Sequence, residues 1–206
     1  MRYKASHEKT SRGTVNSDGF TLVELLVVIA IIGTLAALFS GNILTALKKG
    51  DEVSCTNNLK NIGQAAIAYS LDKRFFPVAK GKFPPAYESL NVLVRSSAGS
   101  GLKPDVFICP SSIDEKAELD DDYGFVLDEM SNSYAWLGKK TKAATNSGTI
   151  LGCDDSIVDK ENDIEENHDG FLIVVYADSS VKKLEINDME EGADLPKNLV
   201  GQEGGN

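Results

Sequence analysis

The strongest pattern along the chain is an apolar run over residues 20–39, FTLVELLVVIAIIGTLAALF, whose only charged residue is Glu24. A helix of about twenty residues spans roughly 30 Å, the thickness of the hydrocarbon core of a bilayer. The run therefore predicts a membrane-inserted helix. The alternative, a buried core helix, rarely needs so many apolar residues in a domain of this size.

A second pattern continues the first without an intervening proline until Pro77. Spacings of four and three residues place an apolar stripe on one helical face, and its members are Cys55, Leu59, Ile62, Ala66 and Tyr69. We therefore predict one helix from about residue 21 to 72, apolar on all sides over 20–47 and amphipathic over 48–72. Four glycines along it are either soft points or sites of close packing: Gly33, Gly41, Gly50 and Gly63.

Residues 73–189 are rich in loops and contain short strand-like runs. These runs are 105–109, 133–137, 149–153, 171–177 and 181–186. The turn-forming residues Asp178–Ser180 join the last two runs into a hairpin. The predicted fold class is α+β, with the long N-terminal helix packed on a small antiparallel sheet, followed by a polar tail at 190–206.

Charge adds a direction to this picture. The 206 residues carry 21 basic and 31 acidic side chains, a net charge of -10, which argues against nucleic acid as a partner. The segment before the apolar run is nevertheless basic on balance, so it is expected to stay in the cytoplasm, with the chain after the helix outside the membrane. An ordinary secretory signal would be cut after small residues beyond the apolar core, and residues 38–40 are a poor match to such a site.

The junction at residues 18–26, DGFTLVELL, resembles the signal of the type IV pilin and type II secretion pseudopilin superfamily. In that superfamily a prepilin peptidase cuts after the glycine and methylates the new N-terminus. The resemblance implies a cytoplasmic leader at 1–19 ending in Gly19, and a methylated N-terminus at Phe20. It also implies a pilin-like fold and a filament subunit whose partners are the peptidase, other pilin or pseudopilin subunits, and an assembly platform with its ATPase.

Glu24 is an ionisable group inside an apolar helix, where it costs several kcal/mol in lipid and normally has a partner. With the family resemblance, we expect it to meet the terminal amine of a neighbouring subunit and so to set the register of assembly. The alternative is a carboxylate near a helix start that reaches the membrane surface and is favoured by the helix dipole.

Later segments resemble a subgroup of pseudopilin-like proteins with enlarged exported domains. The matching segments are Cys55–Lys60, Phe107–Ser111, His168–Gly170 and Tyr176–Ser179. Ser179 and Ser180 stand where that subgroup has Gly and His, so the hairpin turn is expected to differ.

Three cysteines in an exported domain favour one disulfide with one thiol left over. Cys55 lies on the apolar helix stripe and Cys109 lies in the segment expected to cross it, so we predict that these two pair. Cys153 would then be buried as a small apolar side chain. The alternative is three buried free thiols.

Asp159, Glu161, Asp163 and Glu165 belong to an acidic cluster before the C-terminal strands and are candidate Ca²⁺ ligands. The only cofactor suggested is thus calcium, as some pseudopilins bind it in a similar place. The EF-hand spacing is absent, and a solvated charged loop is the commoner meaning of such a run.

An enzyme is the competing class. His168 with Asp178, Ser179 and Ser180, or Cys153 beside Asp154, supply the residue types of a hydrolase. No nucleophile elbow, metal motif or phosphate loop accompanies them. We therefore predict a structural subunit without catalytic activity, with a membrane-anchored, non-assembling binding protein as the alternative.

Overall fold

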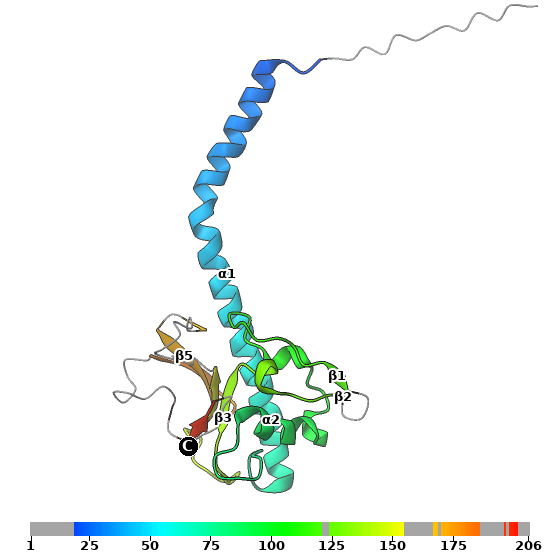
Figure 1. The fold of residues 1–206 in the computed structure, drawn as a ribbon. Coiled ribbons are helices and arrows are strands. Elements are labelled where there is room, and N and C mark those ends of the chain that lie inside the picture. Colours follow the sequence, from blue (N-terminus) through cyan, green and yellow to red (C-terminus); the bar gives the residue numbers. More distant parts are fainter. Residues whose placement is uncertain are drawn as a thin grey trace, which may run out of the picture. The chain divides into compact units, whose positions relative to one another are not determined.

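The computed structural model describes residues 19–120, 124–154, 167–168, 170–185, 196 and 198–201, except the side chains of 39–42 and 120. The chain divides into two compact units, 1–44 and 45–206. Helix α1, Leu22–Lys73, begins in the first unit and continues into the second (Figure 1). The prediction of one long helix ending close to residue 72 is therefore confirmed.

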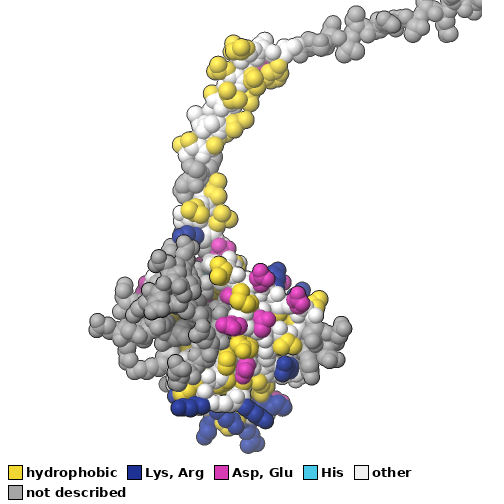
Figure 2. Space-filling model, viewed as in Figure 1, with side chains coloured by type: hydrophobic (Ala, Val, Ile, Leu, Met, Phe, Trp, Pro, Cys, Tyr) yellow, Lys and Arg dark blue, Asp and Glu magenta, His cyan; other side chains and the backbone are white. Residues whose placement is uncertain are grey.

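The first part of α1 exposes its described large apolar side chains. They extend from Leu22 (78% exposed) to Leu38 (72%) and from Ile43 (55%) to Leu47 (60%), and Figure 2 shows apolar side chains on the visible surface of this segment. Among the described residues, no single helix is long and apolar enough to cross a membrane. The segments Leu22–Leu38 and Ile43–Lys73 meet that criterion only when they are counted together.

The domain is built on a five-stranded sheet in the order β6-β5-β4-β3-β7, in which all neighbours are antiparallel. The strands are β3 (Tyr134–Leu137), β4 (Ile150–Asp154), β5 (Phe171–Tyr176), β6 (Val181–Glu185) and β7 (Leu199–Val200). Four of these coincide with predicted strands, and β5 and β6 form the predicted hairpin. The α+β class, a long helix on a small antiparallel sheet, is confirmed.

Several elements differ from the predictions. The run 105–109, predicted as a strand, is largely the 3-10 helix η2 (Pro104–Phe107), because Pro104 at its start fixes a helical φ. Helix α2 (Ala86–Val94) lies in the segment predicted as loops. The tail also contains β7, which extends the sheet beside β3.

A separate hairpin joins β1 (Leu119–Asp120) to β2 (Gly124–Phe125). Two further 3-10 helices are η1 (Ser97–Gly99) and η3 (Glu129–Ser131).

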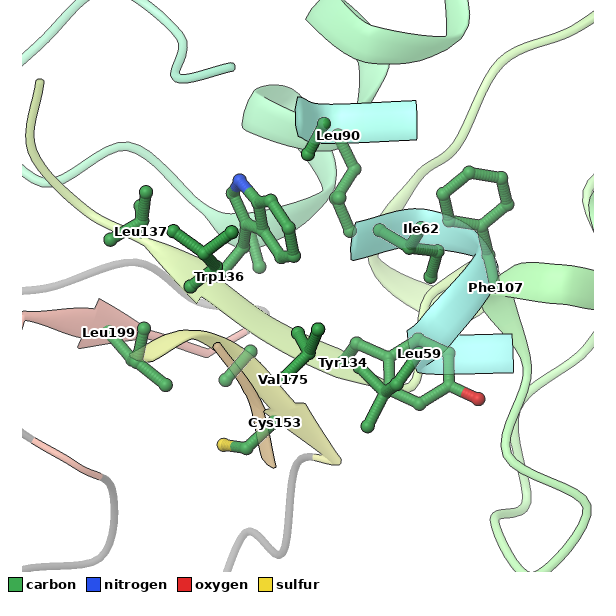
Figure 3. Packing of buried hydrophobic residues seen from close by; sticks show 14 of the residues in the cluster. Leu59, Ile62, Leu90, Phe107, Tyr134, Trp136, Leu137, Cys153, Val175 and Leu199 are labelled. Atoms are coloured by element: carbon green, nitrogen blue, oxygen red, sulfur yellow. The ribbon is translucent and has the colours of Figure 1, made fainter. Parts of the chain in front are cut away.

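The core lies between α1, α2 and the sheet. Leu59 and Ile62 of α1 and Leu90 of α2 surround Tyr134 and Trp136 of β3, and all five side chains are buried (Figure 3). The stripe predicted from the 3–4 spacing is thus the buried face of α1, apart from Tyr69, which is half-buried at its end. In this buried face, side-chain burial rather than helix propensity holds the helix on the sheet.

Two buried polar side chains tie loops to this core. The indole Nε1–H of Trp136 donates to the carbonyl of Pro77 at 2.9 Å. The amide of Asn91 bonds both backbone groups of Leu127, receiving from N at 2.8 Å and donating to O at 2.7 Å. Buried polar groups satisfied in this way fix the path of the chain, because losing either partner would leave the other unpaired.

Candidate functional site

The N-terminus of α1 is organised by two side chains. The Oε2 atom of Glu24 accepts from the backbone N–H of Thr21 at 2.8 Å and from its hydroxyl at 2.6 Å, while Thr21 Oγ1 accepts from the N–H of Glu24 at 3.3 Å. This reciprocal arrangement is a capping box, in which a Thr before the helix and a Glu three residues later satisfy the first free donors.

The capping box was not foreseen, although its sequence signal, Thr-x-x-Glu before an apolar run, is present at residues 21–24. Gly19 and Phe20 precede it and are exposed, as is Glu24. The predicted cleavage position is therefore accessible in the described chain, and Glu24 has a local structural role in addition to the one predicted for it.

A second constellation lies inside the domain. The metal-ligating atoms of Cys55, Cys109 and His168 lie within 4.8 Å of one another, and all three residues are buried. The Nε2 atom of His168 lies 3.6 Å from the Sγ of Cys109 and 3.3 Å from the Oδ2 of Asp154. Asp154 is fully buried, and its Oδ2 accepts no hydrogen bond from the described residues.

Three hydrogen bonds hold the segment before Cys109 against α1 and the start of β3. The carbonyl of the preceding residue, Ile108, accepts from Asn58 Nδ2 at 2.9 Å and from the hydroxyl of Tyr134 at 3.3 Å. The N–H of Ser133 donates to the carbonyl of Phe107 at 2.9 Å. Asn58 is about one turn after Cys55 on α1, so the Cys-x-x-Asn spacing places the thiol beside the amide that binds the carbonyl of Ile108.

The alternation of side chains along β4 separates two neighbouring residues. Asp154 is paired with Tyr134 and Cys153 with Ala135, so Asp154 shares the face of Tyr134, and Cys153 lies on the opposite face. Cys153 is buried there. This explains why only two of the three cysteines meet. No disulfide joins the described cysteines, and the pairing of Cys55 with Cys109 stays a prediction.

The environment shifts the pKa values of this cluster. Burial, followed by the neighbouring Cys109, raises the pKa of Cys55 well above its usual range. The hydrogen bond with Cys55, aided by His168, lowers the pKa of Cys109 to about 5 despite its burial. Burial lowers the pKa of His168, but Cys109 and Asp154 outweigh it and leave it raised. Burial raises the pKa of Asp154 to about 7, against the attraction of His168.

This geometry does not form the hydrolytic sites considered from the sequence. In a Cys-His-Asp triad the thiol and the carboxylate contact different ring nitrogens, whereas Cys109 and Asp154 both face Nε2 of His168. The turn with Asp178 lies at the other end of β5 from His168, about 17 Å away along the strand. Cys153 and Asp154 point to opposite faces. The candidate calcium ligands at 159, 161, 163 and 165 lie outside the described residues.

Comparison with known proteins adds evidence for the N-terminal part. Residues 15–40 match the family described as the prokaryotic N-terminal methylation motif. The chain is 36% identical over 66 residues to the type II secretion system core protein G of Escherichia coli (strain K12), which is 32% of this chain and 46% of that protein. It is 39% identical over 61 residues to the type IV wide pilus major component PilA4 of Thermus thermophilus, 30% of this chain and 47% of that protein.

In its N-terminal part the chain is similar to pilins and pseudopilins. The alignments span less than half the length of these two relatives and about a third of this chain. No solved structure matches it. The domain with the thiol and histidine cluster therefore has to be interpreted from its own geometry.

Proposed function

We propose that this chain is a filament subunit made as a prepilin, cleaved after Gly19 and methylated at Phe20. The observation that carries the proposal is the start of α1. A prepilin-type junction opens directly into a helix that is apolar on all sides and exposes those side chains along its first part. Such a surface needs lipid before assembly and other apolar helices after it.

The mechanism is mechanical. Subunits wait in the inner membrane with their domains outside, the prepilin peptidase removes the leader, and an assembly platform and ATPase draw them into a filament. The helices pack inside it and the domains coat it. The relatives include both a type II secretion protein and a pilus component, and either kind of filament uses this arrangement of helix and domain.

Glu24 is proposed to neutralise the methylated amine of Phe20 in the next subunit. In the single chain its carboxylate is held by the capping box, which keeps it near the helix start. When subunits pack, an oppositely charged group inside an apolar bundle offsets the cost of burying the carboxylate. The proposal therefore assigns the charge to assembly and the hydrogen bonds to helix initiation.

Two substitutions separate these roles. Glu24→Gln keeps a capping-box side chain but removes the charge, whereas Thr21→Ala removes the cap and keeps the charge. In cells that assemble the wild-type chain, we expect Glu24→Gln to reduce filament formation at least tenfold and Thr21→Ala to leave most of it. Sheared filaments and membrane-retained subunits are quantified separately.

Mass spectrometry of the wild-type chain should show an N-terminus at Phe20 with one methyl group. Cysteine pairs introduced between residues 24 and 35 should form crosslinked ladders through helix-to-helix contacts. Normal assembly of Glu24→Gln would refute the assigned charge role. A cleaved or uncleaved chain that never forms ladders would instead indicate the membrane-anchored, non-assembling binding protein.

A further inference from the structure

Four buried side chains converge on one point that the proposed filament role does not use. Cys55 comes from α1, Cys109 from the loop after η2, Asp154 from the end of β4, and His168 from the segment before β5. They are separated by up to 113 positions in the sequence. Chemistry-bearing side chains brought together from four parts of a small domain require an explanation beyond core packing.

Two distances between these side chains match the edges of a tetrahedral metal site. With zinc bonds of about 2.3 Å to sulfur and about 2.0–2.1 Å to nitrogen and oxygen, a tetrahedron has edges of about 3.6 Å from sulfur to nitrogen and about 3.3 Å from nitrogen to oxygen. The corresponding distances here are 3.6 Å from Cys109 Sγ to His168 Nε2 and 3.3 Å from that Nε2 to Asp154 Oδ2. The Sγ of Cys55 lies within 4.8 Å of Cys109 Sγ and of a ring nitrogen of His168.

Hydrogen bonding alone leaves this cluster incompletely satisfied. One imidazole nitrogen faces both a sulfur and a carboxylate oxygen, yet a ring N–H donates one well-aligned hydrogen bond. The carboxylate of Asp154 is fully buried, and among the described residues its Oδ2 accepts no hydrogen bond and shares Nε2 of His168 with Cys109. A buried charge is costly unless it is both paired and hydrogen-bonded. A divalent cation between the four groups satisfies all of them at once.

A Cys55–Cys109 disulfide would use the same two sulfur atoms but would give no role to the other two groups. His168 and Asp154 would then remain buried beside an uncharged bond. Thiolate sulfur, imidazole nitrogen and carboxylate oxygen are all zinc ligands in proteins, and four protein ligands without an open position are the arrangement of structural zinc sites.

We propose that Cys55, Cys109, His168 and Asp154 bind one zinc ion, which fastens α1 to the loop after η2 and to the sheet. The thiols bind as thiolates and release their protons to solvent. The role is structural, because four protein ligands leave no open position for a substrate.

The surroundings hold the ligands in place, as the outer shell of a metal site does. The second carboxylate oxygen of Asp154, Oδ1, accepts the N–H of Ile173. The ring of His168 stacks on Phe171, with centroids 5.4 Å apart and planes 6° from parallel. Asn58 and Tyr134 fix the carbonyl before Cys109, as described above.

The test uses the full chain purified in detergent with its thiols reduced. After chelation, the chain is titrated with Zn²⁺ and, in parallel, with Co²⁺. We expect one equivalent to bind, with the near-ultraviolet thiolate band and the intense visible bands of tetrahedral cobalt. Adding Zn²⁺ in equal amount should displace the cobalt and remove these bands.

Variants locate the site. Cys109→Ser and His168→Gln should abolish the thiolate band or weaken binding at least about tenfold. Cys153→Ser is the matched control, a buried cysteine beside Asp154 on the other face of β4, and should bind as the wild type does. The cobalt spectrum of the wild-type chain tests metal binding without any substitution. The test therefore remains decisive even if one of the variants fails to fold.

Two results would overturn the proposal. One is the absence of a thiolate–cobalt band in the reduced wild-type chain. The other is metal-free chain from native membranes, trapped by alkylation, whose intact mass and peptide map show a Cys55–Cys109 disulfide throughout the population. Either result leaves the proposed filament role untouched, because that role is measured by leader cleavage and helix crosslinking.

Discussion

Ser179 occupies the left-handed region of backbone conformation, with a φ of 61°, at the turn between β5 and β6. Its N–H donates to the carbonyl of Tyr176 at 2.9 Å, and the N–H of Ser180 donates to Asp178 Oδ1 at 2.9 Å. The side chain of Ser180, followed by its backbone N–H, lowers the pKa of Asp178 by hydrogen bonding to the carboxylate. The turn is therefore formed as the hairpin requires, with a residue type that this φ disfavours.

Ser179→Gly should stabilise the domain by about 1 kcal/mol, because glycine adopts a positive φ without a steric penalty. Urea unfolding followed by the fluorescence of Trp136, the only tryptophan of the chain, measures the change. Ser180→Gly is the control, since its φ is not positive, and should be neutral or destabilising. Equal effects of the two substitutions would contradict the explanation.

Gly63 sets the distance between helix α1 and strand β5. A Cβ at this position would lie 2.5 Å from Cγ2 of Val175, a buried β-branched side chain that cannot easily move. Of the two possibilities raised by the sequence for Gly63, close packing is therefore the one observed. Gly50, also in α1, has no atom within 4 Å of such a Cβ.

Gly63→Ala should lower the free energy of unfolding by about 1 kcal/mol or more, since overpacking exceeds the gain in helix propensity. Gly50→Ala should raise it by up to about 1 kcal/mol, because only the propensity changes there. Denaturant midpoints of the two variants test the opposite signs. Val175→Ala should relieve part of the cost at Gly63, and additive effects of the two substitutions would contradict direct contact.

The elements differ in how well the sequence predicts them. Helix α1 and strands β3 to β6 follow from uninterrupted periodicity and turn residues, which are local signals. The two-residue strand β7 owes its existence to the neighbouring β3, as in the bond from the N–H of Gly138 to the carbonyl of Asn198. Proline-rich flanks concealed α2, and the apolar 105–109 segment gave a misleading strand signal.

The candidate site shows the same division. The meeting of Cys55 and Cys109 could be predicted from a helical stripe and a crossing segment. The approach of His168 and Asp154 could not, because no spacing in the chain encodes it and it arises from the order of strands in the sheet. The capping role of Glu24 has a local sequence signal, Thr-x-x-Glu at residues 21–24. The resemblance to pilins directed the interpretation of this residue to assembly instead.

At the scale of the whole molecule, every residue of the buried apolar cluster comes from Cys55 or later. The unit 45–206 should therefore fold without the segment before it. We expect a chain beginning at Thr45 to be soluble without detergent and to unfold cooperatively, with Trp136 buried as in the full chain. Near-ultraviolet circular dichroism and tryptophan emission check this, and a fragment with solvent-exposed tryptophan would contradict it.

The exposed first part of α1 has a consequence for how the chain evolves. No described side chain between residues 22 and 47 belongs to the core of the domain. Substitutions there therefore leave the folding of the domain largely unaffected, and selection acts on them through what the helix contacts outside the chain. The buried side chains of the domain, in contrast, mainly contact one another, so matched changes among them are tolerated. One helix can thus remain recognisable across secretion and pilus proteins while the domains behind it diverge beyond detection.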